Sequence, residues 1–298
     1  MSKDLVSLGE TMVSLAPRHG ESLRDAASLL VDHAGAESNT CVGLARLGFD
    51  VAWVSRLGTD AAGDRIVDAL AAERVDTRWV RRDPQRPTGL MLKDPEAGVR
   101  YYRAGSAASV LSAADLEGVP IAEARAVLVT GVTALIGPDP HAAGLAFLAA
   151  ARGLRIVDPN LRNGLWGSDR RAELVRTLVE RCDLLLAGSA ELAEVIRSGA
   201  DSLERLARSA RALGPREIVV RGAGAVGALD EDGSWRTLEI RRDAAVDPIG
   251  AGDAFNAGYI AVRLRGGAIE EALAAGARCG AAVTTAVSDT SGFPRSLG

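Results

Sequence analysis

Short apolar runs alternate with amphipathic segments along most of the chain, and this pattern predicts an α/β fold. Strands are predicted where four or five apolar residues stand between turn signals, and helices where apolar residues recur three and four positions apart. The repeated βα units imply a mostly parallel central sheet with helices on both faces. The predicted strands are Leu5–Leu8, Val51–Ser55, Ala126–Thr130, Leu154–Val157, Leu184–Ala187 and Glu217–Val220. The predicted helices are Glu37–Leu47, Ala61–Glu73, Ala142–Arg152, Arg170–Arg181 and Leu203–Leu213.

Two regions, residues 11–33 and about 88–104, are strand-like but lack a full helix between neighbouring strands. Within the second region, Thr88–Leu92 and Val99–Arg103 flank Asp94–Gly98, which is typical of a hairpin turn. Strands that leave a parallel sheet and pair with each other indicate a small β lid. Because no linker or low-complexity tract divides the chain, we expect a single α/β domain over residues 1–298 with this lid inserted.

The composition of the chain limits the kinds of ligand and partner that we expect it to bind. The 298 residues carry a formal net charge of −4 and show no basic run, so a nucleic-acid partner has no electrostatic support. No stretch reaches the roughly 18 apolar residues of a membrane span, and the first residues do not form an apolar leader. Cys41, Cys182 and Cys279 are far apart and are expected in the core rather than in disulfides. We therefore expect a cytoplasmic protein that binds metabolites.

Residues 222–227 fit the pattern GxGxxG directly after a predicted strand. A dinucleotide-binding motif would need a helix to begin at these glycines. Here Val226–Leu229 has the pattern of another strand, Asp230–Gly233 that of a turn, and Trp235–Ile240 that of a returning strand. A nicotinamide or flavin dehydrogenase is therefore disfavoured, although the glycines could still let a nucleotide approach the backbone.

The most informative segment is residues 247–255 (DPIGAGDAF), which leads into a helix that runs to about Leu264. Gly250 and Gly252 permit a tight turn, and the amides of Gly250, Ala251 and Gly252 with the helix N-terminus could hold phosphate oxygens. Asp253, in the first helical turn, could accept a proton from a substrate hydroxyl. A helix cap with two turn glycines would explain the same residues without catalysis.

A second candidate site lies in residues 34–48, followed by Gly58, Asp60 and Gly63. Gly35 would permit close approach of a ligand, and Asn39 offers a donor and an acceptor to hydroxyl groups of a ligand. An ordinary turn and helix start would account for the same residues.

These two segments resemble the signatures of the ribokinase-like, phosphofructokinase-B-type carbohydrate kinases, DTxGAGDAF and GGAxxNxAxxLxxLG followed by GxDxxG. The resemblance runs from residue 5 to about residue 290, with departures at Pro248, Ile249 and Ala34. It implies an ATP-dependent sugar kinase in which Asp253 is the base and the amides of residues 250–253 stabilise the phosphoryl group.

Residues 101–109 (YYRAGSAAS) bear on the choice of sugar. On a strand Tyr101 and Arg103 share one face, and a guanidinium pairs well with the carboxylate of an acidic sugar. The run is similar to a segment of 2-keto-3-deoxygluconate kinases, which implies substrate contacts from Tyr101 and Arg103, with Tyr102 as a further candidate. A solvated strand whose tyrosines pack at a dimer contact is the alternative. Met91 stands where that branch often has tyrosine, which keeps another hexose or acidic sugar open as the substrate.

The resemblance also implies the remaining site residues. Arg162, in a DxNxR pattern with Asn160, would lie between sugar and phosphates, and Asp289 would touch the sugar. Glu191 would hold Mg²⁺ through water, although Gly188 replaces the family's asparagine. ATP would lie along Arg221, Gly222, Gly224 and Gly227 and reach Gly250 and Gly252. Each of these assignments has a structural alternative. The alternatives are a capped strand end for Arg162, a helix-start carboxylate for Glu191, a turn aspartate for Asp289 and a plain hairpin for the glycines after Arg221.

Together these features predict a kinase that uses ATP and Mg²⁺ to phosphorylate 2-keto-3-deoxygluconate at its terminal hydroxyl. A homodimer or higher homo-oligomer through the lid is expected. A fructokinase- or ribokinase-like enzyme acting on a neutral sugar is the alternative. A non-catalytic sugar sensor is the rival from another class, but such a protein would not need to retain Asp253 and the glycine turn.

Overall fold

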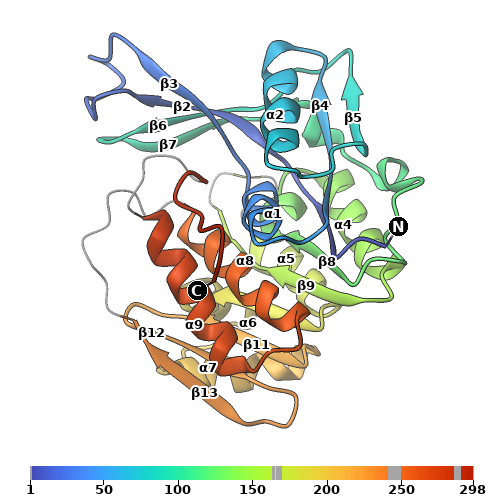
Figure 1. The fold of residues 1–298 in the computed structure, drawn as a ribbon, viewed down its shortest axis with the longest axis vertical. Helices are drawn as coiled ribbons and strands as arrows, with labels where there is room; N and C mark the ends of the chain where they lie inside the picture. Colours follow the sequence, from blue (N-terminus) through green and yellow to red (C-terminus); the bar gives the residue numbers. More distant parts are fainter. Residues whose placement is uncertain (1, 163–164, 166–169, 241–249, 285–289, 298) are drawn as a thin grey trace.

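The computed structural model describes residues 2–162, 165, 170–240, 250–284 and 290–297. Within these ranges, nine strands form one sheet in the order β13-β12-β11-β10-β9-β8-β1-β4-β5 (Figure 1). The strands from β11 to β5 are parallel, while β12 and β13 are antiparallel additions at one edge. The strands are β1 (Leu5–Leu8), β4 (Val51–Gly58), β5 (Val80–Asp83), β8 (Ala126–Thr130), β9 (Leu154–Asp158), β10 (Leu184–Gly188), β11 (Glu217–Arg221), β12 (Ala225–Leu229) and β13 (Trp235–Glu239). The predicted parallel sheet is confirmed.

A second, four-stranded sheet projects from the same side of the molecule as α1 and α2 (Figure 1). Its order is β3-β2-β6-β7, with only the β2–β6 pair parallel. These strands are β2 (Met12–Pro17), β3 (Leu29–Ala34), β6 (Leu90–Asp94) and β7 (Gly98–Tyr102). They come from the two regions where the sequence predicted lid strands, and the β6–β7 turn falls at the predicted position.

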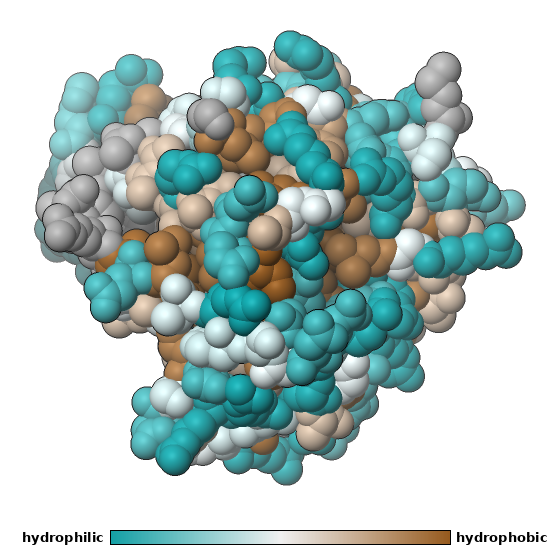
Figure 2. All heavy atoms as spheres, turned by 60° about the horizontal axis from the view of Figure 1, so that its bottom comes forward, coloured by the Kyte–Doolittle hydropathy of each residue, from teal (hydrophilic) through white to brown (hydrophobic). Residues whose placement is uncertain are grey.

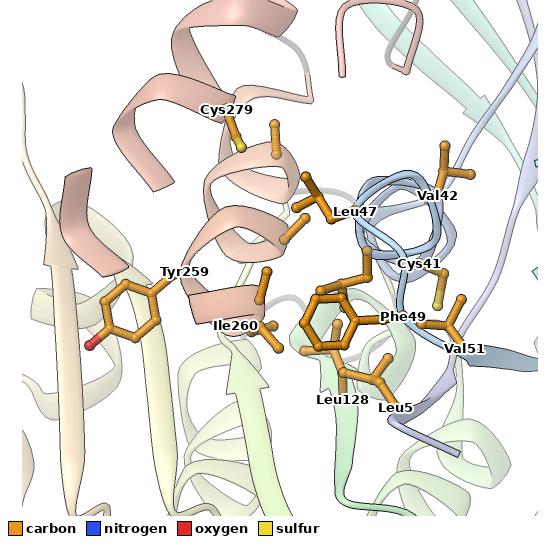
Figure 3. Close-up of a cluster of buried hydrophobic side chains, with 14 of the residues drawn as sticks. Leu5, Cys41, Val42, Leu47, Phe49, Val51, Leu128, Tyr259, Ile260 and Cys279 are labelled. Carbon is orange, nitrogen blue, oxygen red and sulfur yellow. The ribbon is translucent and has the colours of Figure 1, made fainter. Parts of the chain in front are cut away.

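Helices cover both faces of the large sheet. On one face, α1, α2, α8 and α9 pack on side chains that alternate along the strands, such as Leu5, Val51 and Leu128 (Figure 3). On the other face, α4 to α7 pack on the intervening side chains, such as Val6 and Val127. Because side chains of a strand point alternately to opposite faces, continuous apolar strands supply both layers.

Most helices lie where the periodicity placed them, with ends shifted by a few residues. The predicted helix at Ala142 begins earlier, at Pro138, since proline suits the first helical turn. Gly48 follows α1 at φ +91°, the left-handed position that favours glycine. The helices are α1 (Ala36–Arg46), α2 (Ala61–Ala72), α3 (Gly131–Ala134), α4 (Pro138–Ala150), α5 (Arg171–Val179), α6 (Ser189–Ile196), α7 (Leu203–Ala210), α8 (Ala251–Leu264) and α9 (Ile269–Val283).

The GxGxxG segment is a turn between two strands, as predicted. Gly222 donates its N–H to the oxygen of Ala225 at 2.8 Å, and β12 then returns antiparallel to β11. The glycines therefore do not open a helix, which removes the structural context of a dinucleotide-binding motif.

Polar and apolar side chains are distributed as in a globular protein. Figure 2 shows one face on which hydrophilic residues predominate, with hydrophobic side chains visible between them. In the part of the chain that is described, none of the helices has the length and apolar character needed to cross a membrane. All three cysteines are buried and form no disulfide, and burial raises the pKa of the Cys279 thiol to about 11.

Candidate active site

A cavity of about 700 Å³ lies between the two sheets. The carboxyl ends of β9, β10 and β11 form one wall, which is where ligands bind in open parallel sheets. The first turns of α1 and α8 form a second wall, and the small sheet forms the third. The predicted site residues that line it are Gly35, Asn39, Tyr101, Arg103, Asn160, Arg162, Glu191, Arg221, Gly222, Gly250, Gly252 and Asp253.

Asp253 is held by side chains from α1. Its Oδ2 accepts a hydrogen bond from Asn39 Nδ2 at 2.9 Å, and the Thr40 hydroxyl lies 3.3 Å from its backbone oxygen. The Oδ1 of Asn39 is buried and has no hydrogen-bond partner among the described residues. Asn39 can thus position the carboxylate and still offer an acceptor to a ligand hydroxyl.

Gly250, the residue that precedes α8, has a backbone conformation that suits glycine. Gly250 caps the helix at φ +84°, in the left-handed region that favours glycine. A Cβ at Gly252 would meet nothing closer than the Arg221 guanidinium at 3.8 Å, so the backbone lies open toward that side chain. Because the first N–H groups of a helix have no intrahelical acceptor, this turn can bind an anion.

Arg221 connects the glycine turn to the end of β9. It donates to Asp158 Oδ2 at 3.0 Å and also to Asn256 Oδ1, while Asn256 Nδ2 donates to the same Asp158 oxygen at 2.7 Å. Burial would lower the pKa of Arg221, but the charges of Asp158, Glu191 and Asp253 raise it. The guanidinium is therefore a fixed positive charge at the base of the cavity.

Asn160 and Arg162 extend this wall from the end of β9. Asn160 has a φ of +35°, in the left-handed region that is uncommon for residues other than glycine. Its N–H donates to Asp158 Oδ1 at 3.1 Å, and its buried Oδ1 has no partner within the described ranges. Strained backbone with an unsatisfied buried acceptor at a cavity wall is typical of a binding site.

Glu191 opens α6 and lines the same cavity. Burial and the nearby charge of Asp158 raise its pKa, while Arg221 and Arg162 act in the opposite direction. No cluster of three or more metal-binding side chains was found within the described ranges. A Mg²⁺ ion that keeps most of its water needs only one or two carboxylates, and Glu191 with Asp158 fits that requirement.

The small sheet contributes Arg103 and Tyr101. Both face the cavity, and the guanidinium lies 5.2 Å from the centroid of the Tyr101 ring. Arg103 also pairs with the buried Glu10, with 2.5 Å between Nη2 and Oε2. Met12, Ala34 and Met91 form an apolar patch beside this pair. The small sheet and its flanking residues thus offer a charged pair and an apolar surface to the cavity that Asp253 also lines.

Four predicted residues, Tyr102, Gly224, Gly227 and Ala251, are not among the residues that line the cavity, which departs from the prediction. Tyr102 pairs with Leu90 in the strand register and is 58% exposed, because neighbouring residues of a strand face opposite sides. Gly227 lies within β12, where a Cβ would overlap the Trp235 ring at 2.0 Å. Gly224, in the turn before β12, is likewise not part of the wall. Asp289 lies outside the described residues.

Gly35 lines the cavity, and its lack of a side chain also has a structural effect. A Cβ at this position would lie 2.4 Å from the backbone oxygen of Glu10 and 2.6 Å from Thr11 Oγ1. The missing side chain therefore makes room for the chain itself, at the point where the small sheet meets α1.

Comparison with known proteins decides the family. Residues 2–295 match the model of the pfkB family carbohydrate kinases. The chain belongs to this family. The predicted ribokinase-like fold and the predicted class of ATP-dependent carbohydrate kinase are thereby confirmed.

Relatives within the family include enzymes that act on different sugars. The chain is 34% identical to the 2-dehydro-3-deoxygluconokinase of Bacillus subtilis (strain 168), over 99% of this chain and 93% of the relative. It is 33% identical to a fructokinase of Klebsiella pneumoniae, over 96% and 95% of the two chains. The crystal structure of a PfkB protein from Polaromonas sp. JS666 superposes with a TM-score of 0.87 at 32% identity, covering 99% and 98%.

Sequence reasoning missed Glu10, Asn256 and the contacts of Asp60. Asp60 caps α2 by accepting from the Gly63 N–H at 2.8 Å, and it also accepts from the Thr88 N–H and hydroxyl, each at 2.7 Å. Thr88 precedes β6, so the GxDxxG segment anchors the small sheet. No local pattern marks Glu10 or Asn256, because their partners are distant in sequence.

Proposed function

We propose that this kinase transfers the γ-phosphoryl group of ATP to the terminal hydroxyl of 2-keto-3-deoxygluconate. The observation that carries the proposal is the position of Asp253, which faces the cavity from the first turn of α8 and is held by Asn39. The relative from Bacillus subtilis named for this substrate supports the choice of sugar. Arg103 and Tyr101, which line the same cavity, supply groups that suit an acidic sugar.

In the proposed reaction, Asp253 accepts the proton of the sugar hydroxyl as the oxygen attacks the γ-phosphorus. The amides of residues 250–253 stabilise charge on the transferring group, and Arg221 and Arg162 neutralise phosphate oxygens. Glu191, with Asp158, would hold Mg²⁺, which neutralises phosphate charge when bound. Binding and orientation supply most of the acceleration, since phosphoryl transfer requires little covalent chemistry from the protein.

A neutral sugar is the second candidate, and one observation favours it. The Glu10 carboxylate already neutralises Arg103, so the positive charge available to a sugar acid is reduced. The relative named fructokinase from Klebsiella pneumoniae also supports this reading. Turnover of fructose or ribose without turnover of the keto-deoxy acid would decide in its favour.

The small sheet is proposed to act as a lid of a single α/β domain and as the contact between two copies of the chain. Its cavity side is apolar or charged, whereas Leu90 and Tyr102 on its outer side are exposed. Closure would exclude water from the phosphoryl group and limit hydrolysis of ATP.

The test is an ADP-release assay with 2-keto-3-deoxygluconate, fructose and ribose. Asp253→Asn should lower kcat by about 10²–10⁴-fold, because the amide cannot accept the proton. Asp201→Asn, at an exposed aspartate with 76% of its side chain accessible, is the matched control and should leave turnover unchanged. Equal turnover by wild type and Asp253→Asn would refute the mechanism.

A further inference from the structure

Arg103 is paired with a buried acid that the predicted mechanism does not use. Glu10, which follows β1 after one residue, has a side chain only 1% exposed, and that of Arg103 is 9% exposed. The two are joined by the contact of 2.5 Å, and Ser106 Oγ donates to the second carboxylate oxygen at 3.1 Å. Ser106 thus holds one Glu10 oxygen by a hydrogen bond, while Oε2 has no hydrogen-bond partner in the described part of the chain and meets the Arg103 guanidinium as a close ion pair.

The pair lies at the ligand cavity rather than deep in the core. Both residues line the cavity, and the Nε of Arg103 is buried with no hydrogen-bond partner in the described part of the chain. A buried N–H without an acceptor costs free energy. An oxygen of a ligand bound beside Arg103 would remove that cost, so the arrangement points to a ligand group at Nε.

Positive and negative side chains nearly balance each other in the cavity that Glu10 and Arg103 line. The described residues that line the cavity include four carboxylates, Glu10, Asp158, Glu191 and Asp253, and three guanidinium groups, Arg103, Arg162 and Arg221. Arg221 is committed to Asp158, on the wall formed by the large sheet. On the wall formed by the small sheet, Glu10 and Arg103 cancel each other, so a ligand carboxylate there meets both an attraction and a repulsion.

We propose that Glu10 is a specificity-determining residue of the sugar site. Its carboxylate holds Arg103 in place and offsets its charge, so the pair, rather than Arg103 alone, sets how strongly the site prefers a sugar acid over a neutral sugar. The inference rests on the proposed sugar kinase activity and adds a residue that acts through Arg103.

The direction of the effect follows from the charges. Glu10→Gln keeps the size of the side chain and an oxygen that can accept from Arg103, but it removes the negative charge. At an effective dielectric constant of about 20, two charges about 6 Å apart interact strongly enough to change a Kd by well over tenfold. Glu10→Gln should therefore raise the ratio of Kd for fructose to Kd for 2-keto-3-deoxygluconate at least about tenfold.

The experiment measures both dissociation constants by isothermal titration calorimetry without nucleotide. Glu10→Asp retains the charge and should keep the ratio close to that of wild type. Glu117→Gln removes the same charge from a side chain that is 87% exposed, and it should also leave the ratio unchanged. A folded Glu10→Gln variant whose ratio is unchanged or lower would overturn the inference.

A second pair of variants keeps the test decisive if Glu10→Gln does not fold. Arg103→Met leaves Glu10 uncompensated and should weaken binding of the acid, whereas Glu10→Gln/Arg103→Met removes both charges and should restore part of that loss. Equal acid binding by these two variants would also overturn the inference. Wild type that binds sugars without releasing ADP would contradict the proposed function but not the role of Glu10.

Discussion

Asp253 is positioned by α1 as well as by its own helix. Asn39 donates to its carboxylate, and two residues before Asn39 the buried Glu37 anchors the first turn of α1. Glu37 Oε1 accepts from the Thr130 N–H at 3.0 Å and from the hydroxyls of Thr130 and Thr133 at 2.8 and 2.7 Å. The proposed base therefore depends on the junction between α1 and the end of β8.

Removing the amide that holds the base should slow catalysis. Asn39→Ala deletes a hydrogen bond to a charged group, which is worth about 1.5–3 kcal/mol, so kcat/KM should fall by about 10–100-fold. Steady-state kinetics checks this, with Thr40→Ser as a control that retains the neighbouring hydroxyl. An unchanged kcat/KM in Asn39→Ala would show that Asp253 is positioned without Asn39.

We expect the Mg²⁺ requirement of the enzyme to depend on pH because of Glu191. Burial and Asp158 raise its pKa above the ordinary 4.5, so it takes up a proton at a higher pH than a solvated glutamate. Only the ionised carboxylate binds Mg²⁺, and the concentration of Mg²⁺ for half-maximal rate should therefore rise as pH falls through the raised pKa. Mg²⁺ titrations at several pH values test this; Glu191→Gln should need more Mg²⁺ at every pH, with a flatter pH dependence.

At the scale of secondary-structure elements, the carboxylate of Asp60 connects α2 to the segment that leads into β6. Asp60 both caps α2 and binds Thr88 before β6. Asp60→Ala should lower the free energy of unfolding by about 0.5–2 kcal/mol, as for other helix caps. Urea unfolding measures it, with Asp68→Ala, at an exposed position of the same helix, as the control.

The contribution of Asp60 to the free energy of unfolding is expected to depend on pH. Burial would raise the pKa of Asp60, but hydrogen bonds from Thr88 and Gly63 outweigh it and lower the pKa below 3.8. A lowered pKa in the folded state means that the stabilisation is complete above 3.8 and is lost as pH falls through the folded value. The difference between wild type and Asp60→Ala should accordingly shrink in acid.

Strands of the parallel sheet could be predicted from sequence because they are buried on both faces and read as continuous apolar runs. Leu5–Leu8 and Ala126–Thr130 were predicted with the bounds that the structure gives. The edge strand β5 (Val80–Asp83) was not predicted, since three of its four residues are polar and two are exposed. Local patterns found Asp253 and Arg103, whereas Glu10 could be recognised only from the tertiary contact.

At the scale of the whole molecule, the exposed outer face of the small sheet predicts that two copies of the chain associate. Val31, Leu90 and Tyr102 are 45%, 37% and 58% exposed. If a second copy covers them, light scattering should give the mass of a dimer, and Leu90→Lys/Tyr102→Lys should give a monomer. Arg100→Lys, which keeps the charge of an exposed residue on β7, is the control. A monomeric wild type would contradict the proposed contact.

The alternation along β7 has a consequence for how related sequences can differ. Tyr101 and Arg103 line the cavity, while Tyr102 between them faces outward. Loss of one residue within this strand would turn the outward tyrosine inward and remove the guanidinium from its place beside Glu10. Under the proposed function, substitutions on β7 can change the preferred sugar, whereas insertions and deletions within the strand would disrupt the site.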